Sequence, residues 1–267
     1  MSHLDQNRRA WDTFVRQQQR HTKPARDEDF CSPLGAINND GWIGNISGLQ
    51  VLCLAAGGGR QSALYAAAGA IVTVVDLSPE MLALDRQVAT ERQLNIHAVE
   101  TSMDDLSMLG TAQFDLVVQP VSTCYVPDIA KVYREVARVM RSGGIYISQH
   151  KQPASLQADT RAAVQGYELI EPYYRSGPLP PVVGSQHREP GTLEFLHRWE
   201  ELVGHLCRSG FVIEDLSEPL HAKEDAAVGT FAHRSQFVAP YVRIKARRIG
   251  GATETEPRSA RLWTPET

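Results

Sequence analysis

The sequence of 267 residues lacks the long apolar segments that mark membrane and secreted proteins. Its longest nearly apolar run, Leu64 to Val75, is too short for a transmembrane helix, which needs about 20 residues. The opening stretch, MSHLDQNRRAWD, is polar and has no apolar core of a signal peptide. These absences predict a protein with no membrane span and a cytoplasmic location.

Cysteine pairs and metal-binding patterns are sparse. The four cysteines, Cys31, Cys53, Cys124 and Cys207, lie far apart and form no CxxC pair. We interpret them as free thiols in a reducing compartment. The nine histidines include no HExxH motif, so no metal site is predicted.

An excess of positive charge is also absent. The 27 basic and 31 acidic residues give a net charge of −4. Proteins that bind nucleic acid nonspecifically carry excess positive charge, so nucleic acid is a disfavoured partner. The basic residues that alternate near the C-terminal end of the chain, Arg243, Lys245, Arg247 and Arg248, are interpreted as the solvated face of an edge strand.

Between residues 49 and 150 the sequence alternates between short aliphatic runs and helical stretches. The runs are 51–54, 71–75, 114–118 and 144–148, and the helical stretches are 59–68, 79–93 and 128–140. Buried strands that alternate with helices form right-handed βαβ units. The pattern predicts an α/β fold with a doubly wound, mostly parallel sheet.

The remaining length is expected to flank or interrupt this sheet. Residues 1–48 predict an N-terminal helix and a covering loop, and 250–267 a flexible tail. The sheet domain then spans 49–249, with a lid-like insertion at 151–191. A helix over 198–208 precedes two strands, 211–216 and 237–247, which are expected to pair antiparallel at one edge of the sheet.

The insertion is rich in aromatic residues and proline. It holds Tyr167, Tyr173 and Tyr174, and we expect it to form a substrate lid together with the N-terminal helix that carries Trp11. A contact between subunits is the alternative, and the oligomeric state stays open. The polar residues 187–189 would add polarity suited to an anionic substrate.

A glycine-rich turn and an aspartate are the two sequence features that point to a ligand-binding site. Residues 55–60 (AAGGGR) follow the first strand, where small residues let a ligand approach the backbone. Asp76 follows the second strand, 17 residues after Gly59, close to the spacing at which a carboxylate meets ribose hydroxyls. The pair predicts nucleoside binding. Ser62 stands where a dinucleotide fingerprint has a third glycine or alanine, which makes an NAD(P)-dependent oxidoreductase the weaker alternative.

Four stretches in this order and spacing, VLCLAAGGGR, VTVVDLSPEML, FDLVV and EVARVMRSGG, resemble a class I S-adenosylmethionine-dependent methyltransferase of the small-molecule branch. The AAGGG loop is also similar to that of quinone-methylating members. The resemblance implies a Rossmann-like, seven-stranded sheet with an antiparallel last strand.

The resemblance also implies which residues bind the cofactor. Ala55, which stands at the family's first glycine, would line the methionine moiety with Gly57 and Gly59. Asp76 would bind the ribose hydroxyls, and Leu77 would lie beside the adenine.

Two further stretches complete the implied cofactor site. Ser102 and Met103 would border the adenine, because the stretch 102–106 resembles the family's segment after its third strand. Gln119, just past the strand predicted over 114–118, would hold the amino-acid end of the cofactor.

The implied reaction is in-line transfer of a methyl group from S-adenosylmethionine to a small-molecule acceptor, with S-adenosylhomocysteine as product. A base can assist by removing a proton from the acceptor. The candidates are His150, which follows the strand predicted over 144–148, Tyr125, which follows the strand predicted over 114–118, and His197, which precedes the helix predicted over 198–208. A non-catalytic nucleoside-binding module remains the alternative from another class.

Overall fold

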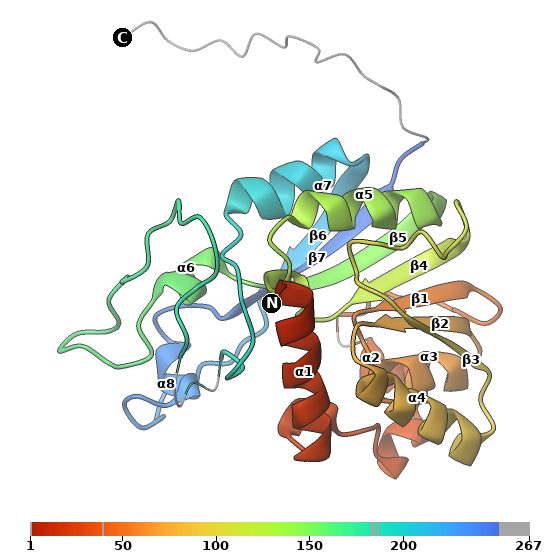
Figure 1. Ribbon diagram of the computed structural model, residues 1–267, viewed down its shortest axis with the longest axis horizontal. Coiled ribbons are helices and arrows are strands. Elements are labelled where there is room, and N and C mark those ends of the chain that lie inside the picture. The colour runs from red at the N-terminus through yellow and green to blue at the C-terminus, as the bar shows by residue number, and fades with distance from the viewer. Residues whose placement is uncertain (1, 39, 183–184, 186, 251–267) are drawn as a thin grey trace, which may run out of the picture.

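Seven strands form one sheet in the order β3-β2-β1-β4-β5-β7-β6 (Figure 1). The structure, a computed structural model, describes residues 2–38, 40–182, 185 and 187–250. The strands are β1 (Gln50–Leu54), β2 (Ile71–Asp76), β3 (Ile96–Glu100), β4 (Phe114–Gln119), β5 (Met140–Lys151), β6 (Phe211–Ser217) and β7 (Tyr241–Arg248). Strands β1 to β5 pair parallel, and β7 pairs antiparallel with both β5 and β6. The predicted fold, including its antiparallel last strand, is confirmed.

Helices cover both faces of the sheet, which is why its central strands are almost continuously apolar. One face packs against α5 (Ile129–Val139), the π-helical turn η4 (Glu200–Gly204) and α7 (His205–Arg208). The other face packs against α2 (Pro33–Ile37), α3 (Gln61–Ala67) and α4 (Pro79–Arg92), as Figure 1 shows. Alternate residues of β1 enter the two cores: Leu52 the first and Cys53 the second.

Local sequence sets the helix boundaries where caps are present. Ser78 caps α4 by accepting a hydrogen bond from the Met81 amide at 3.1 Å, and Pro79 takes the first helical position. Asp128 caps α5 by accepting from the Ala130 amide at 3.0 Å. Helix α5 ends at Val139, and β5 begins at Met140 with a bulge before it pairs regularly from Ile145.

The covering elements lie where the parallel strands end (Figure 1). They are α1 (His3–Arg16), the single turns η1 (Arg20–Thr22) and η2 (Asp27–Cys31), η3 (Thr123–Tyr125), α6 (Pro153–Gln157) and α8 (Phe231–Arg234). The leading amphipathic helix is therefore present as α1. The predicted tail, apart from Gly250 itself, lies outside the described residues. Within the part of the chain that the structure describes, no helix is long and apolar enough to cross a bilayer.

The interpretation of β7 as a solvated edge strand is wrong. The connection over 218–240 lets the chain return between β5 and β6, so β6 is the edge strand instead. Three of the four cations of β7 contact carboxylates: Arg243 contacts Asp40, and Lys245 and Arg247 both contact Glu214. The fourth, Arg248, is buried and donates to backbone carbonyls.

Candidate functional site

A cavity of about 450 Å³ lies at the carboxyl ends of the parallel strands. This is where open α/β sheets bind their ligands, and the volume falls within the usual range for small-molecule sites. Seven of the residues singled out from the sequence line the cavity: Ala55, Gly57, Asp76, Leu77, Ser102, Met103 and Tyr125. Four do not line it, namely Gly59, Gln119, His150 and His197.

The glycine loop needs its small residues for close packing. Its backbone enters the left-handed region at Ala55 (φ 48°), Gly58 (φ 112°) and Gly59 (φ 71°), which side chains disfavour. A Cβ at Gly57 would lie 2.8 Å from the Met81 Cβ and 3.0 Å from the carboxyl carbon of Asp76. The loop backbone therefore lies directly against Asp76 and the first turn of α4.

Asp76 is held at the end of β2 by two backbone donors. Its Oδ2 accepts from the Gly57 amide and its Oδ1 from the Ser78 amide, both at 2.9 Å. Burial raises the pKa of this carboxyl to about 6, and the backbone hydrogen bonds oppose that rise. Each carboxylate oxygen has two lone pairs, so the ionised group can accept further hydrogen bonds from a ligand.

Asp85 is a site residue that the sequence reasoning missed. Its carboxylate is fully buried and accepts from the Gly58 amide at 2.9 Å, the Gly59 amide at 3.0 Å and the Ser62 hydroxyl. Burial raises its pKa to about 6. We call these three hydrogen bonds the loop clamp. They explain why the Gly59 amide turns away from the cavity, and why a serine stands at position 62, where a dinucleotide fingerprint has glycine or alanine. A signal was present, because Asp85 occupies an apolar-face position of α4 between Met81 and Val88.

The segment after β3 lines another side of the cavity, and the end of β4 lies behind that segment. The Ser102 hydroxyl bonds Asp104, and Met103 is buried. Gln119 lies behind them, donating to the Met103 Sδ at 3.3 Å and to the Ser122 Oγ at 3.0 Å. Gln119 thus positions Met103 and does not itself face the cavity.

Two of the three candidate bases are buried away from the cavity. His150 is fully buried, and its ring nitrogens bond the hydroxyls of Thr123 and Ser148, both at 2.8 Å. Burial lowers its pKa to about 3. His197 is buried too, with its Nε2 bonded to the Thr123 carbonyl at 2.9 Å. Because side chains alternate along β5, Gln149 lines the cavity and His150 points elsewhere.

Segments far apart in the chain cover the cavity. Their lining residues are Leu4, Asn7, Trp11, Arg20, His21 and Lys23 near the N-terminus, Glu189 in the insertion, His221 and Phe231 between β6 and β7, and Tyr241 at the start of β7. The tyrosines expected in the lid, Tyr167, Tyr173 and Tyr174, do not line it. Phe231 and Tyr241, neither of which was expected in the lid, supply aromatic rings instead.

Helix α1 is anchored over the cavity by buried polar contacts. The Asn7 amide donates to the carbonyls of Tyr125 and Leu193, both at 3.1 Å, and its oxygen accepts from the Leu193 amide at 2.7 Å. On the other side Arg8 donates to the Leu77 carbonyl at 3.1 Å. Helix α1 thereby connects Tyr125 and the segment just after the insertion with the loop after β2.

The glycine loop, the aspartate after β2 and the sheet order together define a Rossmann-like methyltransferase fold. A family model described as a methyltransferase domain matches residues 52–148. The uncharacterized methyltransferase YbaJ of Bacillus subtilis (strain 168) is 36% identical over 213 residues, which cover 78% of this chain and 83% of that protein. The chain belongs to the S-adenosylmethionine-dependent methyltransferase family. This confirms the predicted enzyme class and cofactor over the oxidoreductase alternative.

Other relatives match over shorter or more diverged stretches. A ubiquinone biosynthesis O-methyltransferase of Xanthomonas oryzae pv. oryzae is 32% identical over 128 residues, about half of each chain (47% of this one and 52% of the other). A solved S-adenosylmethionine-dependent methyltransferase from Mesorhizobium loti has a TM-score of 0.63 at 21% identity, covering 82% of this chain and all of that one. A geranyl diphosphate C-methyltransferase from Streptomyces coelicolor has a TM-score of 0.62 at 15% identity, covering 93% and 99%. These structures share the fold.

Proposed function

We propose that this methyltransferase acts on a small molecule bound in the same cavity as its cofactor, releasing S-adenosylhomocysteine. The observation that carries the proposal is that two kinds of residue line one cavity: the glycine loop, Asp76 and Met103 on the one hand, and aromatic and charged side chains of the covering segments on the other. We propose that the first group surrounds the cofactor part of the cavity and that the second group surrounds the acceptor part.

The residues of the first part fit the cofactor. Asp76 would bind the ribose hydroxyls, because its carboxylate borders the cavity with lone pairs to spare. Leu77, Ser102 and Met103 would border the adenine. Ala55 and Gly57 would line the methionine moiety, where the absence of a side chain at Gly57 lets the backbone come close.

The second part would hold the acceptor. When bound, S-adenosylmethionine supplies a methyl group on a positively charged sulfur. The task of the protein is then to align the acceptor with that group, and orientation of this kind can supply about 7–11 kcal/mol of the barrier. Tyr125 can border the acceptor. We assign His150 and His197 no proton transfer, because both are buried outside the lining.

The enclosure of the cavity supports a small acceptor and argues against nucleic acid. Covering segments before, within and after the sheet all contribute lining residues. We propose that residues 1–48 and the insertion at 151–191 form the roof of a single domain extending to residue 249. A cytoplasmic location is supported by the four cysteines, all of which are free.

Calorimetry tests the cofactor assignment directly. We expect S-adenosylhomocysteine to bind the folded protein at one site per chain, and NADH to give no heat. Absence of S-adenosylhomocysteine binding by a folded sample would contradict the cofactor assignment.

The acceptor class needs its own experiment. The protein is incubated with S-adenosylmethionine carrying a radioactive methyl group and with a bacterial extract separated into small-molecule, RNA and protein fractions. We expect label in the small-molecule fraction, whereas label confined to RNA or protein would contradict the proposed acceptor class.

A further inference from the structure

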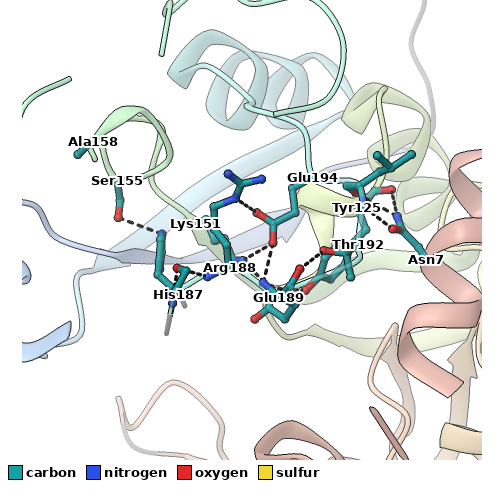
Figure 2. Close-up of polar contacts among 12 residues, drawn as sticks. Asn7, Tyr125, Lys151, Ser155, Ala158, His187, Arg188, Glu189, Thr192 and Glu194 are labelled. Carbon is teal, nitrogen blue, oxygen red and sulfur yellow. Dashed lines mark hydrogen bonds and ion pairs between the residues drawn. The ribbon is translucent and has the colours of Figure 1, made fainter. Parts of the chain in front are cut away.

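A group of four charged side chains, two of them buried and two partly exposed, lies beside the acceptor part of the cavity (Figure 2). The Lys151 ammonium, at the end of β5, contacts the Glu189 Oε2 at 2.7 Å and the Glu194 Oε1 at 2.9 Å. Arg188 donates through Nε to the Glu194 Oε2 at 2.7 Å. Two cations therefore balance two anions, which is the condition under which buried charges are tolerated.

Only one member of this group reaches the cavity. Glu189 lines it, and its side chain is 16% exposed, whereas the side chains of Lys151 and Glu194 are 1% and 0% exposed. Arg188 turns towards Glu194, so it does not serve the anionic substrate expected from residues 187–189. The network presents a carboxylate to the cavity.

The Glu189 carboxylate is held by one of its two oxygens. Oε2 accepts from the Tyr125 hydroxyl at 2.8 Å and from Lys151. Among the described residues no donor is bonded to Oε1, which leaves that oxygen for a ligand. Burial disfavours the charged form, but Lys151 and the surrounding hydrogen bonds outweigh it and lower the pKa of Glu189 below its usual range. Glu189 is therefore ionised at neutral pH, and so weak a base is suited to binding.

The surroundings of Glu189 combine aromatic rings with polar side chains. Pairing of Lys151 with Tyr241 across β5 and β7 places Gln149, Lys151 and Tyr241 on one face of the sheet. Gln149 and Tyr241 line the cavity, and their side-chain polar atoms make no hydrogen bond within the described part of the chain. Rings of Tyr125 and Phe231 complete the walls.

We propose that Glu189, fixed by Lys151 and Tyr125, binds the methyl acceptor, and that the acceptor is a flat aromatic molecule carrying an O–H or N–H group. This inference rests on the proposed function, because it assigns the second part of the same cavity. The donor group bonds Oε1 of Glu189 while the ring packs between the aromatic walls. Glu189 is thus a specificity-determining residue.

Binding of matched probes to the protein saturated with S-adenosylhomocysteine tests the proposal. The probes are 2-naphthol against 2-methylnaphthalene and p-cresol against p-xylene, which exchange a hydroxyl for a methyl group of similar size. In wild type we expect at least one hydroxylated probe to bind about tenfold or more tightly than its partner, since hydrogen bonds to charged groups are the strong ones. Equal binding within both pairs overturns the proposal.

Two variants separate binding from structural support. Glu189→Gln should abolish the preference for the hydroxylated probe. Glu194→Gln removes the other carboxylate bound to Lys151, which is more deeply buried and does not reach the cavity, so it should lower thermal stability but keep the preference. Loss of the preference in both variants would assign the effect to structure and overturn the proposal.

A milder variant covers the case in which these proteins fail to fold. Tyr125→Phe keeps the ring but removes the hydroxyl that holds Oε2, and it should reduce the preference several-fold; an unchanged preference counts against the proposal. Binding of S-adenosylhomocysteine is measured for each protein. Failure of that binding in wild type would refute the proposed function, whereas intact binding without a probe preference refutes only this inference.

Discussion

The two parts of the cavity differ in how much of the chain each requires. The residues proposed to bind the cofactor come from one continuous stretch, residues 55–103, in which short loops follow β1, β2 and β3. The acceptor part combines α1, the end of β5, Glu189 and the segment 221–241. Local sequence patterns can specify the first part, whereas the second exists only after distant segments have packed together.

The largest expected effect is on the loop clamp of the cofactor part. Asp85→Ala should lower the free energy of unfolding by about 3 kcal/mol or more, since unsatisfied buried groups cost about 1–3 kcal/mol each. The groups left without their acceptor are the Gly59 amide and the Ser62 hydroxyl, whereas the Gly58 amide keeps its second acceptor, the Met81 carbonyl at 3.1 Å. Urea unfolding at pH 7 measures the loss. Asp85→Asn keeps one acceptor oxygen and should lose less; equal stability of wild type and Asp85→Ala would refute the clamp.

The next effect concerns the ribose contact. Asp76→Ala should weaken binding of S-adenosylhomocysteine by about 100-fold or more, because hydrogen bonds to a charged group contribute about 1.5–3 kcal/mol each. Calorimetry gives the dissociation constant. Asp115→Ala is the matched control, since Asp115 bonds the Gln50 amide at the opposite end of the sheet. A dissociation constant unchanged by Asp76→Ala would remove Asp76 from the proposed site.

Acidic pH should produce a smaller loss through the same residue. The pKa of Asp76 is raised by burial to about 6, and only the ionised carboxylate can accept from both ribose hydroxyls. Binding of S-adenosylhomocysteine should therefore be about tenfold weaker at pH 5 than at pH 7, in line with one proton per pH unit below the pKa. The Asp76→Asn variant should flatten the profile. A persistent slope in that variant would point to Asp85, whose pKa is also raised to about 6.

The smallest effect on cofactor binding is expected from a change in the acceptor part. Asn7→Ala removes the anchor of α1 on Tyr125 and Leu193. Hydrogen exchange of α1 should accelerate while β1 and β4 stay protected, because stability is local. Affinity for S-adenosylhomocysteine should change by less than about threefold, since Asn7 touches none of the proposed cofactor residues. Arg9→Ala, on the exposed side of α1, serves as the control. A cofactor loss as large as that of Asp76→Ala would show that the two parts are not separable.

Sequence reasoning succeeded where a residue's role follows from its neighbours in the chain. The sheet and the helix over 79–93 were predicted from the alternation of aliphatic and helical stretches, and the glycine loop was predicted from its small residues. Gln119 and His150 show the limit, because position after a strand does not tell which side of the strand a residue faces. For His150, one step along β5 separates the cavity from the core.

The sequence by itself determined the methyltransferase fold and the part of the cavity proposed for the cofactor, since βαβ order and loop chemistry are local properties. Tertiary structure alone decided the rest. It brought Lys151, Glu189 and Glu194 together from positions up to 43 residues apart, and it placed β7 inside the sheet. Long-range ion pairs and strand insertion depend on which surfaces bury one another, and no local pattern encodes that choice.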